Sequence, residues 1–239
     1  ILATFTLIGS FFFANAQYSN VEFGRNRVQY KKVKWQFYET DNFRIYFSQG
    51  GQDIGKYVIQ AAEKNLEHVN ELLDFKLSNK LDIIVYNDIS DMHQTNIGIK
   101  EDVENISGTV QLKNNRLFVY FNGKHSDIDK QIKRGIAELY INRVSGGNGI
   151  QELIKNSFLV DFPYWFAEGL ARYVSEDWTT ENDNRLKQGI LSGQFSNLSK
   201  LSIEDQAFVG HSVWSFLEQN FSKDVIGNIL YLAKVNRSV

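Results

Sequence analysis

The chain has 239 residues, of which 43% are hydrophobic and 14% aromatic, and it contains no cysteine. This composition excludes a disordered chain, a disulfide framework, a thiol nucleophile and a cysteine-ligated metal. With 26 Lys and Arg against 28 Asp and Glu, the formal net charge is −2, so no overall positive field attracts nucleic acid or anionic lipid. We therefore expect no nucleic-acid partner.

The first 16 residues form a continuous apolar run that ends in Ala14-Asn15-Ala16. One small residue on each side of a variable residue is the pattern after which signal peptidase cleaves. The apolar run is also too short to span a bilayer. Residues 1–16 therefore predict a signal peptide truncated at its start, followed by an N-terminal extension over residues 17–34. This signal predicts a secreted or periplasmic protein of the cell envelope whose mature chain has no transmembrane segment. A buried N-terminal strand or helix is the alternative.

The next part of the chain carries strand patterns and one long helical pattern. Aromatic and β-branched runs around turn-forming residues are typical of β-hairpins, and apolar residues three and four apart are typical of an amphipathic helix. The predicted elements are a hairpin over residues 35–48, a helix over 52–74, a strand over 80–87, and a second hairpin made of 107–112 and 116–122.

From residue 125 onward, helical spacing replaces strand spacing. Ile128, Ile132, Ile136 and Leu139 mark the buried side of a helix over residues 126–144. Strands first and helices afterwards indicate an α+β fold, with a mostly antiparallel N-terminal sheet and one long helix, followed by a helical C-terminal half. No repeat or linker interrupts the chain, so we expect one domain over residues 35–239. The later predicted helices cover residues 150–158, 163–175, 180–192, 205–220 and 223–235.

Two segments of the helical half carry the functional signal. Residues 137–141 read AELYI on the predicted helix over 126–144, and residues 163–171 read PYWFAEGLA. This pair resembles the peptidase MA-like domains of exported bacterial proteins, which are gluzincin-type zinc metallopeptidases of the zincin fold. In that family a helix bearing HExxH precedes a P-x-W-F-x-E-G-x-A segment. Histidines four residues apart on a helix share one face, which lets both imidazoles bind one zinc ion.

The resemblance assigns positions to the residues of both segments. Glu168 stands at the position of the third zinc ligand, and Glu138 at the position of the general base. Ala137 and Ile141 stand where the two histidines belong. Carboxylates without an imidazole make a poor zinc site, so we expect a degenerate form with no bound cofactor and an inactive Glu138.

A degenerate peptidase can keep its cleft as a binding surface. The resemblance therefore implies a non-catalytic domain that binds a protein or peptide in the cell envelope, with Trp165, Phe166 and Tyr140 contacting that partner. It also implies that a further domain can follow residue 239.

Simpler structural roles compete with these assignments. Glu138 is expected to pair with Arg134, one helical turn earlier. Glu168 is equally compatible with a role in the first turn of its helix, where the helix dipole favours a negative charge. His125 is expected to be a loop or capping residue, and His211 is the next candidate metal ligand.

Three further functions stay open. The first is a metal-dependent or carboxylate-based hydrolase, in which a remodelled peptidase site of Glu138, Glu168 and His211 would bind zinc. The second is glycosidase chemistry by the paired carboxylates of Glu138 and Glu168. The third is a structural adaptor whose former cleft is filled by Tyr140, Tyr164 and Trp165. Serine-hydrolase and nucleotide-binding functions are disfavoured, because no G-x-S-x-G motif and no phosphate-binding glycine loop occur.

Overall fold

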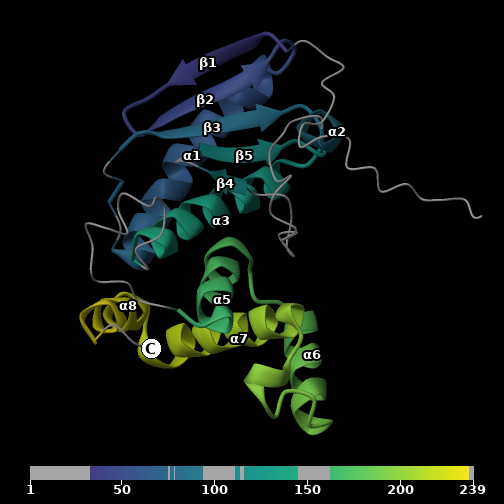
Figure 1. Ribbon diagram of the computed structural model, residues 1–239, viewed down its shortest axis with the longest axis vertical. Coiled ribbons are helices and arrows are strands. Elements are labelled where there is room, and N and C mark those ends of the chain that lie inside the picture. The colour runs from purple at the N-terminus through teal and green to yellow at the C-terminus, as the bar shows by residue number, and fades with distance from the viewer. Residues whose placement is uncertain are drawn as a thin grey trace, which may run out of the picture.

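The computed structural model describes residues 33–74, 76–77, 79–93, 111–113, 116–144 and 162–236. A strand-rich part comes first in the chain and a helical part follows, so the predicted α+β class is confirmed (Figure 1). The predicted signal peptide over residues 1–16 and the predicted helix over residues 150–158 lie outside the described residues.

Five strands and seven α-helices make up the described part of the chain. The strands are β1 (Trp35–Glu39), β2 (Phe43–Ser48), β3 (Leu81–Tyr86), β4 (Gln111–Lys113) and β5 (Arg116–Tyr120). The helices are α1 (Gln52–Leu73), α2 (Ile89–His93), α3 (His125–Val144), α5 (Tyr164–Ser175), α6 (Thr180–Leu191), α7 (Ile203–Phe221) and α8 (Asp224–Asn236), with a 3-10 turn η1 (Leu198–Lys200) before α7. The predicted elements that fall within the described residues are present, with small shifts at their ends, whereas α2 and η1 were not predicted.

The strands form one mixed sheet in the order β1-β2-β3-β5-β4. The two outer pairs, β1 with β2 and β4 with β5, are antiparallel, whereas β3 is parallel to both of its neighbours. The prediction of a mostly antiparallel sheet is therefore wrong. The reason is that α1 carries the chain across the sheet between β2 and β3, and a crossover of this kind makes the two strands parallel.

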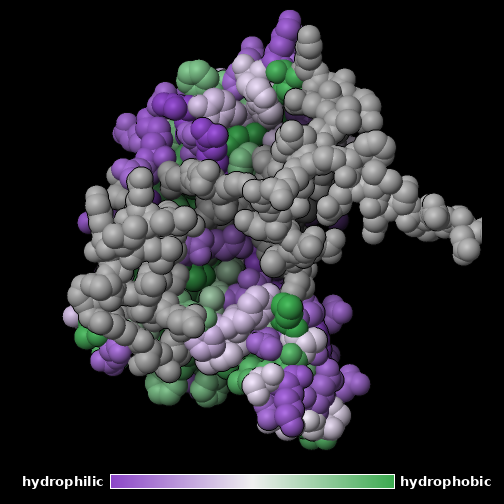
Figure 2. All heavy atoms as spheres, viewed as in Figure 1, coloured by the Kyte–Doolittle hydropathy of each residue, from purple (hydrophilic) through white to green (hydrophobic). Residues whose placement is uncertain are grey.

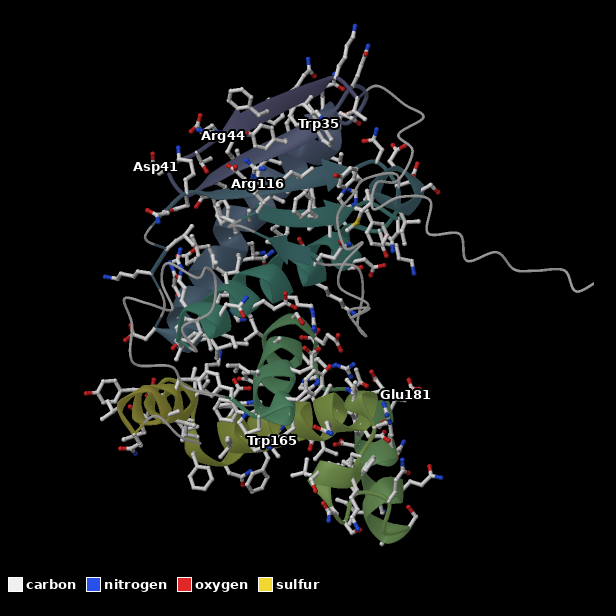
Figure 3. The ribbon with its side chains drawn as sticks, viewed as in Figure 1. Trp35, Asp41, Arg44, Arg116, Trp165 and Glu181 are labelled. Carbon is white, nitrogen blue, oxygen red and sulfur yellow. The ribbon has the colours of Figure 1, made fainter. Side chains whose placement is uncertain are left out.

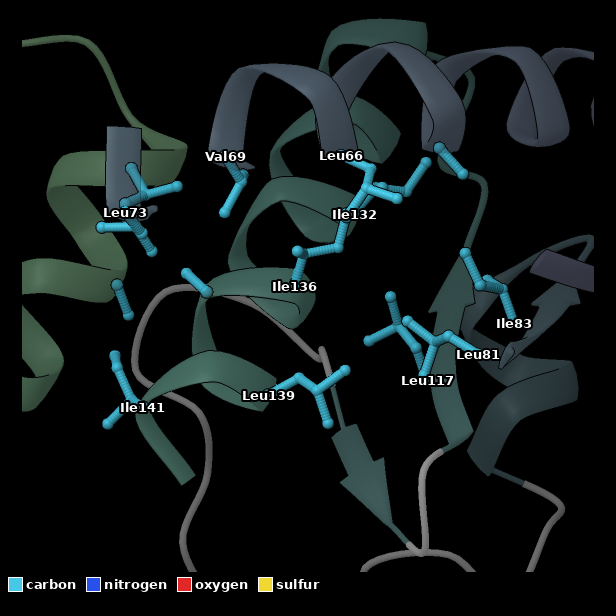
Figure 4. Packing of buried hydrophobic residues seen from close by; sticks show 14 of the residues in the cluster. Leu66, Val69, Leu73, Leu81, Ile83, Leu117, Ile132, Ile136, Leu139 and Ile141 are labelled. Atoms are coloured by element: carbon cyan, nitrogen blue, oxygen red, sulfur yellow. The ribbon is translucent and has the colours of Figure 1, made fainter. Parts of the chain in front are cut away.

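One face of the sheet is covered by α1 and α3, and the main core lies between these layers (Figure 4). Along β2, buried and partly exposed residues alternate, because successive side chains of a strand point to opposite faces. Leu66 and Val69 of α1 and Ile132 and Ile136 of α3 meet Ile83 in this core. Burying five such aliphatic side chains contributes on the order of 10 kcal/mol before the entropy of ordering them is subtracted.

Glycine allows α3 to lie very close to the sheet. A Cβ atom added at Gly135 would lie 2.3 Å from Cδ1 of Leu117 on β5. A side chain here would therefore push α3 off the sheet, together with the Glu138 side chain that α3 carries.

The helical part is organised around the crossing of α5 and α7. A Cβ atom at Gly210 of α7 would lie 1.9 Å from the backbone oxygen of Trp165, and one at Gly169 of α5 would lie 2.4 Å from the carbonyl carbon of Gly210. The two backbones are thus in direct contact. Figure 3 shows Trp165 at this crossing, far from the sheet.

The surface of the helical part has an apolar region at the C-terminal helices. Phe216, Phe221, Leu232 and Val235 are each more than half exposed, and apolar side chains gather at this lower end of the molecule (Figure 2). None of the helices described has the length and apolar character that crossing a membrane requires.

Candidate functional site

Four residues of α3 define the side of this helix that the resemblance singles out. Arg134, Ala137, Glu138 and Ile141 are spaced three and four residues apart, so they share one face. Helix α5, which carries Glu168, packs against α3. The fold therefore brings together the two segments on which the resemblance depends.

The two residues at the histidine positions belong to the core. Ala137 is fully buried and Ile141 is 7% exposed, and both join the same hydrophobic cluster as Leu170 of α5. Neither side chain has a nitrogen or oxygen that could bind a metal ion. The chain's own residues thus do not fit a zinc ion at this position. No group of three or more His, Asp or Glu side chains within the described ranges is placed to hold a metal ion.

A buried arginine connects the two glutamates instead. Arg134 is 2% exposed, and its Nε lies 2.9 Å from Oε1 of Glu138. Its Nη2 donates a hydrogen bond to Oε1 of Glu168 on α5. The predicted pairing of Glu138 with Arg134 is confirmed, and the same guanidinium also reaches the neighbouring helix.

Glu168 is the fifth residue of α5 and lies beyond its first turn. The interpretation that the helix dipole at the first turn explains this glutamate is therefore wrong. Its side chain is 15% exposed and lies between two arginines, Arg134 and, at 4.0 Å, Arg172. Burial beside these cations explains why a negative side chain is tolerated at this position.

The charges continue from Arg172 toward α6 and α7. The two terminal nitrogens of Arg172 donate to Oε1 and Oε2 of Glu204 at 3.0 and 2.6 Å, a bidentate pair. Arg185 of α6 donates to Asp205 at 2.9 Å and lies over the ring of Phe208 at 4.1 Å. A row of alternating charges therefore links α3, α5, α7 and α6.

The side chain of His211 contacts groups other than the two glutamates. It is 2% exposed, its ring packs against Trp178 at 5.0 Å and Tyr173 at 6.4 Å, and it lines a cavity of about 220 Å³. Burial and the charge of Arg172 lower the pKa of His211 to about 4, against a smaller opposite effect of Asp177. Among the described residues no interaction joins His211 to Glu138 or Glu168. The three side chains of the remodelled hydrolase site are therefore not gathered together.

The predicted ligand-binding aromatic residues occupy different environments. Phe166 is 3% exposed and packs against Phe162 and Trp214 at ring distances of 4.9 and 4.8 Å, so it is a core residue and leaves no surface for a partner. Trp165 and Tyr140 are each half-buried. Burial and the charge of Asp74 raise the pKa of Tyr140 to about 12.

Tyr164, at the start of α5, is 38% exposed and is the most accessible aromatic side chain beside Glu168. Burial of its hydroxyl and the nearby charge of Glu168 raise the pKa of Tyr164 to about 12. The phenol is therefore neutral and can donate a hydrogen bond at the rim of the α3–α5 surface.

His125 is an exposed residue at the first position of α3, where its ring lies 4.3 Å from that of Tyr57 and 5.3 Å from that of Phe121. This position agrees with the prediction of a residue at the helix start. Its ring contacts are with α1 and the segment after β5, and no described contact joins it to Glu138 or Glu168, so we assign it no part in the candidate site.

Sequence reasoning missed two features of this site. It found Arg134 only as a partner of Glu138 and did not connect it with Glu168, although an arginine on the functional face of α3 was a usable signal. It also missed Arg172, four residues after Glu168 on the same face of α5.

The sequence was also compared with known proteins. It matches no protein-family model, and no curated protein is significantly similar to it.

Proposed function

We propose that this chain is a non-catalytic, peptidase-like domain of the cell envelope that binds a protein or peptide segment. The proposal includes a zincin-like arrangement of the described elements and export by the signal peptide predicted over residues 1–16. The observation that carries it is that one guanidinium, the buried one of Arg134, holds the carboxylates of both Glu138 and Glu168. We call the surface around Glu138, Glu168 and Tyr164 the former cleft.

This arrangement argues against hydrolysis at the former cleft. A general base must contact the attacking water, and here the carboxylate of Glu138 is held by the guanidinium of Arg134 instead. Ala137 and Ile141 supply no atom that could hold a Lewis acid beside Glu138.

Peptide binding is supported by the sheet edge beside α3. Strand β4 pairs with β5 on one side, and within the described residues no strand pairs with its other side. An open strand edge can add an extended peptide through backbone hydrogen bonds. This edge is next to α3 (Figure 1). On α5, the exposed Tyr164 beside Glu168 offers a separate aromatic contact and hydrogen-bond donor.

Metal analysis and a hydrolysis assay test the loss of catalysis. The purified chain is expected to contain less than stoichiometric zinc and to leave a set of unstructured peptides intact. Stoichiometric zinc together with peptide hydrolysis that Glu138→Gln abolishes would establish the hydrolase alternative and overturn the proposal.

A peptide array tests binding. We expect the chain to retain a subset of extended peptides and Tyr164→Ala to weaken that binding several-fold. Tyr231→Ala is the matched control, because Tyr231 is an exposed tyrosine (66%) on α8, away from the former cleft. Equal losses for both variants, or no retained peptide at all, would favour the structural adaptor.

A further inference from the structure

We infer that a cavity between α1 and α3 binds the phosphate group of a small molecule, with Lys64 and Lys133 supplying positive charge and Asn65 supplying a buried hydrogen-bond donor. We call it the α1–α3 cavity. It shares no lining residue with the former cleft, so this inference does not depend on the proposed function.

The α1–α3 cavity has a volume of about 420 Å³ and lies where the two helices pack side by side (Figure 1). Helix α1 contributes Lys64, Asn65 and His68, and α3 contributes Asp129 and Lys133. Lys64 and His68 are four residues apart, as are Asp129 and Lys133, so each pair shares one face of its helix. The volume is in the range of small-molecule sites and leaves room beyond a single phosphate group.

The first observation that points to a ligand is the amide of Asn65. This residue is 6% exposed, and its Nδ2 has no hydrogen-bond partner within the part of the chain that the structure describes. Nearly all buried polar atoms of native proteins are hydrogen-bonded, and an unpaired one costs free energy. Because Asn65 lines the α1–α3 cavity, a ligand that accepts a hydrogen bond from it there removes this cost.

The second observation is the charge of the cavity. Lys64 and Lys133 line it from opposite helices, and in the described ranges neither lysine forms an ion pair with a carboxylate. One acidic residue, Asp129, also lines the cavity, and its Oδ2 accepts a hydrogen bond from the hydroxyl of Tyr57 at 2.9 Å. Two cations against one carboxylate leave a net positive charge, which favours an anion.

The third observation is the titration of His68, which lines the same cavity. Burial is the largest cause that lowers its pKa, and the positive charges of Lys133 and Lys223 lower it further, against smaller opposite effects of Glu71 and Glu218. The surroundings of His68 are therefore positive, in agreement with the count of charges. Its imidazole is mostly neutral at pH 7 and can donate one hydrogen bond.

These donors identify the class of ligand. They are two ammonium groups, an amide and an imidazole, from two different helices. A phosphate group offers several acceptor oxygens and up to two negative charges, so it can use donors that reach it from several directions. A carboxylate has only two oxygens and one charge. Gln60 and Asp129 also line the cavity and can bond to hydroxyl groups, so a phosphate monoester such as a sugar phosphate suits the site better than free phosphate.

Isothermal titration calorimetry of the wild-type chain at constant ionic strength tests the inference. Glucose 6-phosphate and inorganic phosphate should both bind along saturating curves, with glucose 6-phosphate the tighter, and acetate at the same concentrations should not bind. Equal affinities for the two phosphates would identify the phosphate group alone as the feature recognised, which supports the site with free phosphate as its ligand. No saturable binding of either phosphate, or equal binding of acetate, would overturn the inference.

Lysine variants locate the binding in the cavity. Lys64→Gln and Lys133→Gln should each weaken the affinity for glucose 6-phosphate about tenfold, because each removes a charge-assisted hydrogen bond. Lys56→Gln is the matched control, since it removes the same charge from an exposed position of α1 that does not line the cavity. Equal weakening by all three substitutions would show a general attraction between charges and would refute the site.

Asn65→Leu separates ligand binding from a structural role. Leucine has a similar size and no unpaired polar atom, so the Tm without ligand should stay the same or rise while the affinity for glucose 6-phosphate falls several-fold. A lower Tm with unchanged affinity would show that Asn65 is structural and would contradict the inference. If this variant does not fold, the lysine variants decide. A failure of these measurements leaves the peptide-array result of the proposed function unaffected, because the two sites share no residue.

Discussion

Arg134 and Glu168 form an ion pair that joins α3 to α5 inside the protein, across 34 positions of the sequence. An ion pair of this kind is costly to break from one side, because the remaining charge stays buried without its partner. Several measurable consequences arise from this pair and from the helix packing around it.

Glu168→Gln should destabilise the protein by about 3 kcal/mol, the low end of the cost of breaking a buried ion pair. Glu138→Gln should cost less, about 1 kcal/mol, because Glu138 pairs within its own helix and is more exposed. Urea unfolding of both variants measures the difference. Equal losses of unfolding free energy would show that the Arg134–Glu168 pair between the helices stabilises the protein no more than the Arg134–Glu138 pair within α3.

Placing histidines at the two positions that the resemblance indicates tests whether Arg134 blocks a zinc site. Ala137→His/Ile141→His should bind zinc weakly while Arg134 still holds both glutamates. Adding Arg134→Ala frees Glu168 as the third ligand, so the triple variant should bind zinc at least tenfold more tightly. Titration with a chromophoric zinc chelator measures both affinities, and circular dichroism checks that each variant is folded. The same zinc affinity in both would contradict a blocking role for Arg134.

Gly210→Ala should disrupt the crossing of α5 and α7. The added methyl group would meet the backbone oxygen of Trp165, so the helices must separate, at a cost of about 2 kcal/mol or more. Gly227→Ala on α8 is the matched control, because a Cβ atom there meets nothing within 4 Å. The control should be neutral or stabilising by up to about 1 kcal/mol, since alanine favours helix more than glycine does. Thermal unfolding compares the two substitutions directly.

His211 should make stability depend on pH in the acidic range. Burial and Arg172 lower its pKa to about 4 in the folded chain, from an ordinary value of 6.5. The unfolded chain therefore binds the proton first as the pH falls from 6.5 toward 4, and the free energy of unfolding decreases over this window. The full loss is roughly 3 kcal/mol, at about 1.4 kcal/mol for each unit of pKa.

The test of the His211 effect is urea unfolding between pH 7 and pH 4 for the wild type and His211→Gln. The variant keeps a polar side chain of similar size without an ionisable group, so its stability should fall less steeply with acid. Other groups around the same cavity, among them His68, Asp177 and Glu218, remain in both proteins and cancel in the comparison. Identical slopes would exclude His211 as the cause.

Most of the described secondary structure could be predicted from the sequence, because its signals are local. The alternating residues of β2 and the regular apolar spacing of α1 depend on neighbours within one element. The pairing of Glu138 with Arg134 was predictable for the same reason, since residues four apart on a helix always lie close together. The composition also determined that cysteine chemistry has no part in this chain of 239 residues.

Strand direction, the helix crossing and the second partner of Arg134 were decided by the tertiary structure. Whether β3 runs parallel to its neighbours depends on how the chain crosses the sheet, and the contact of Gly210 with Trp165 depends on how two helices pack. The sequence established that Ala137 and Ile141 cannot bind zinc. Only the packing of α3 against α5 revealed that a guanidinium lies between Glu138 and Glu168, because contacts between distant segments arise from the shape of the whole fold and leave no local pattern.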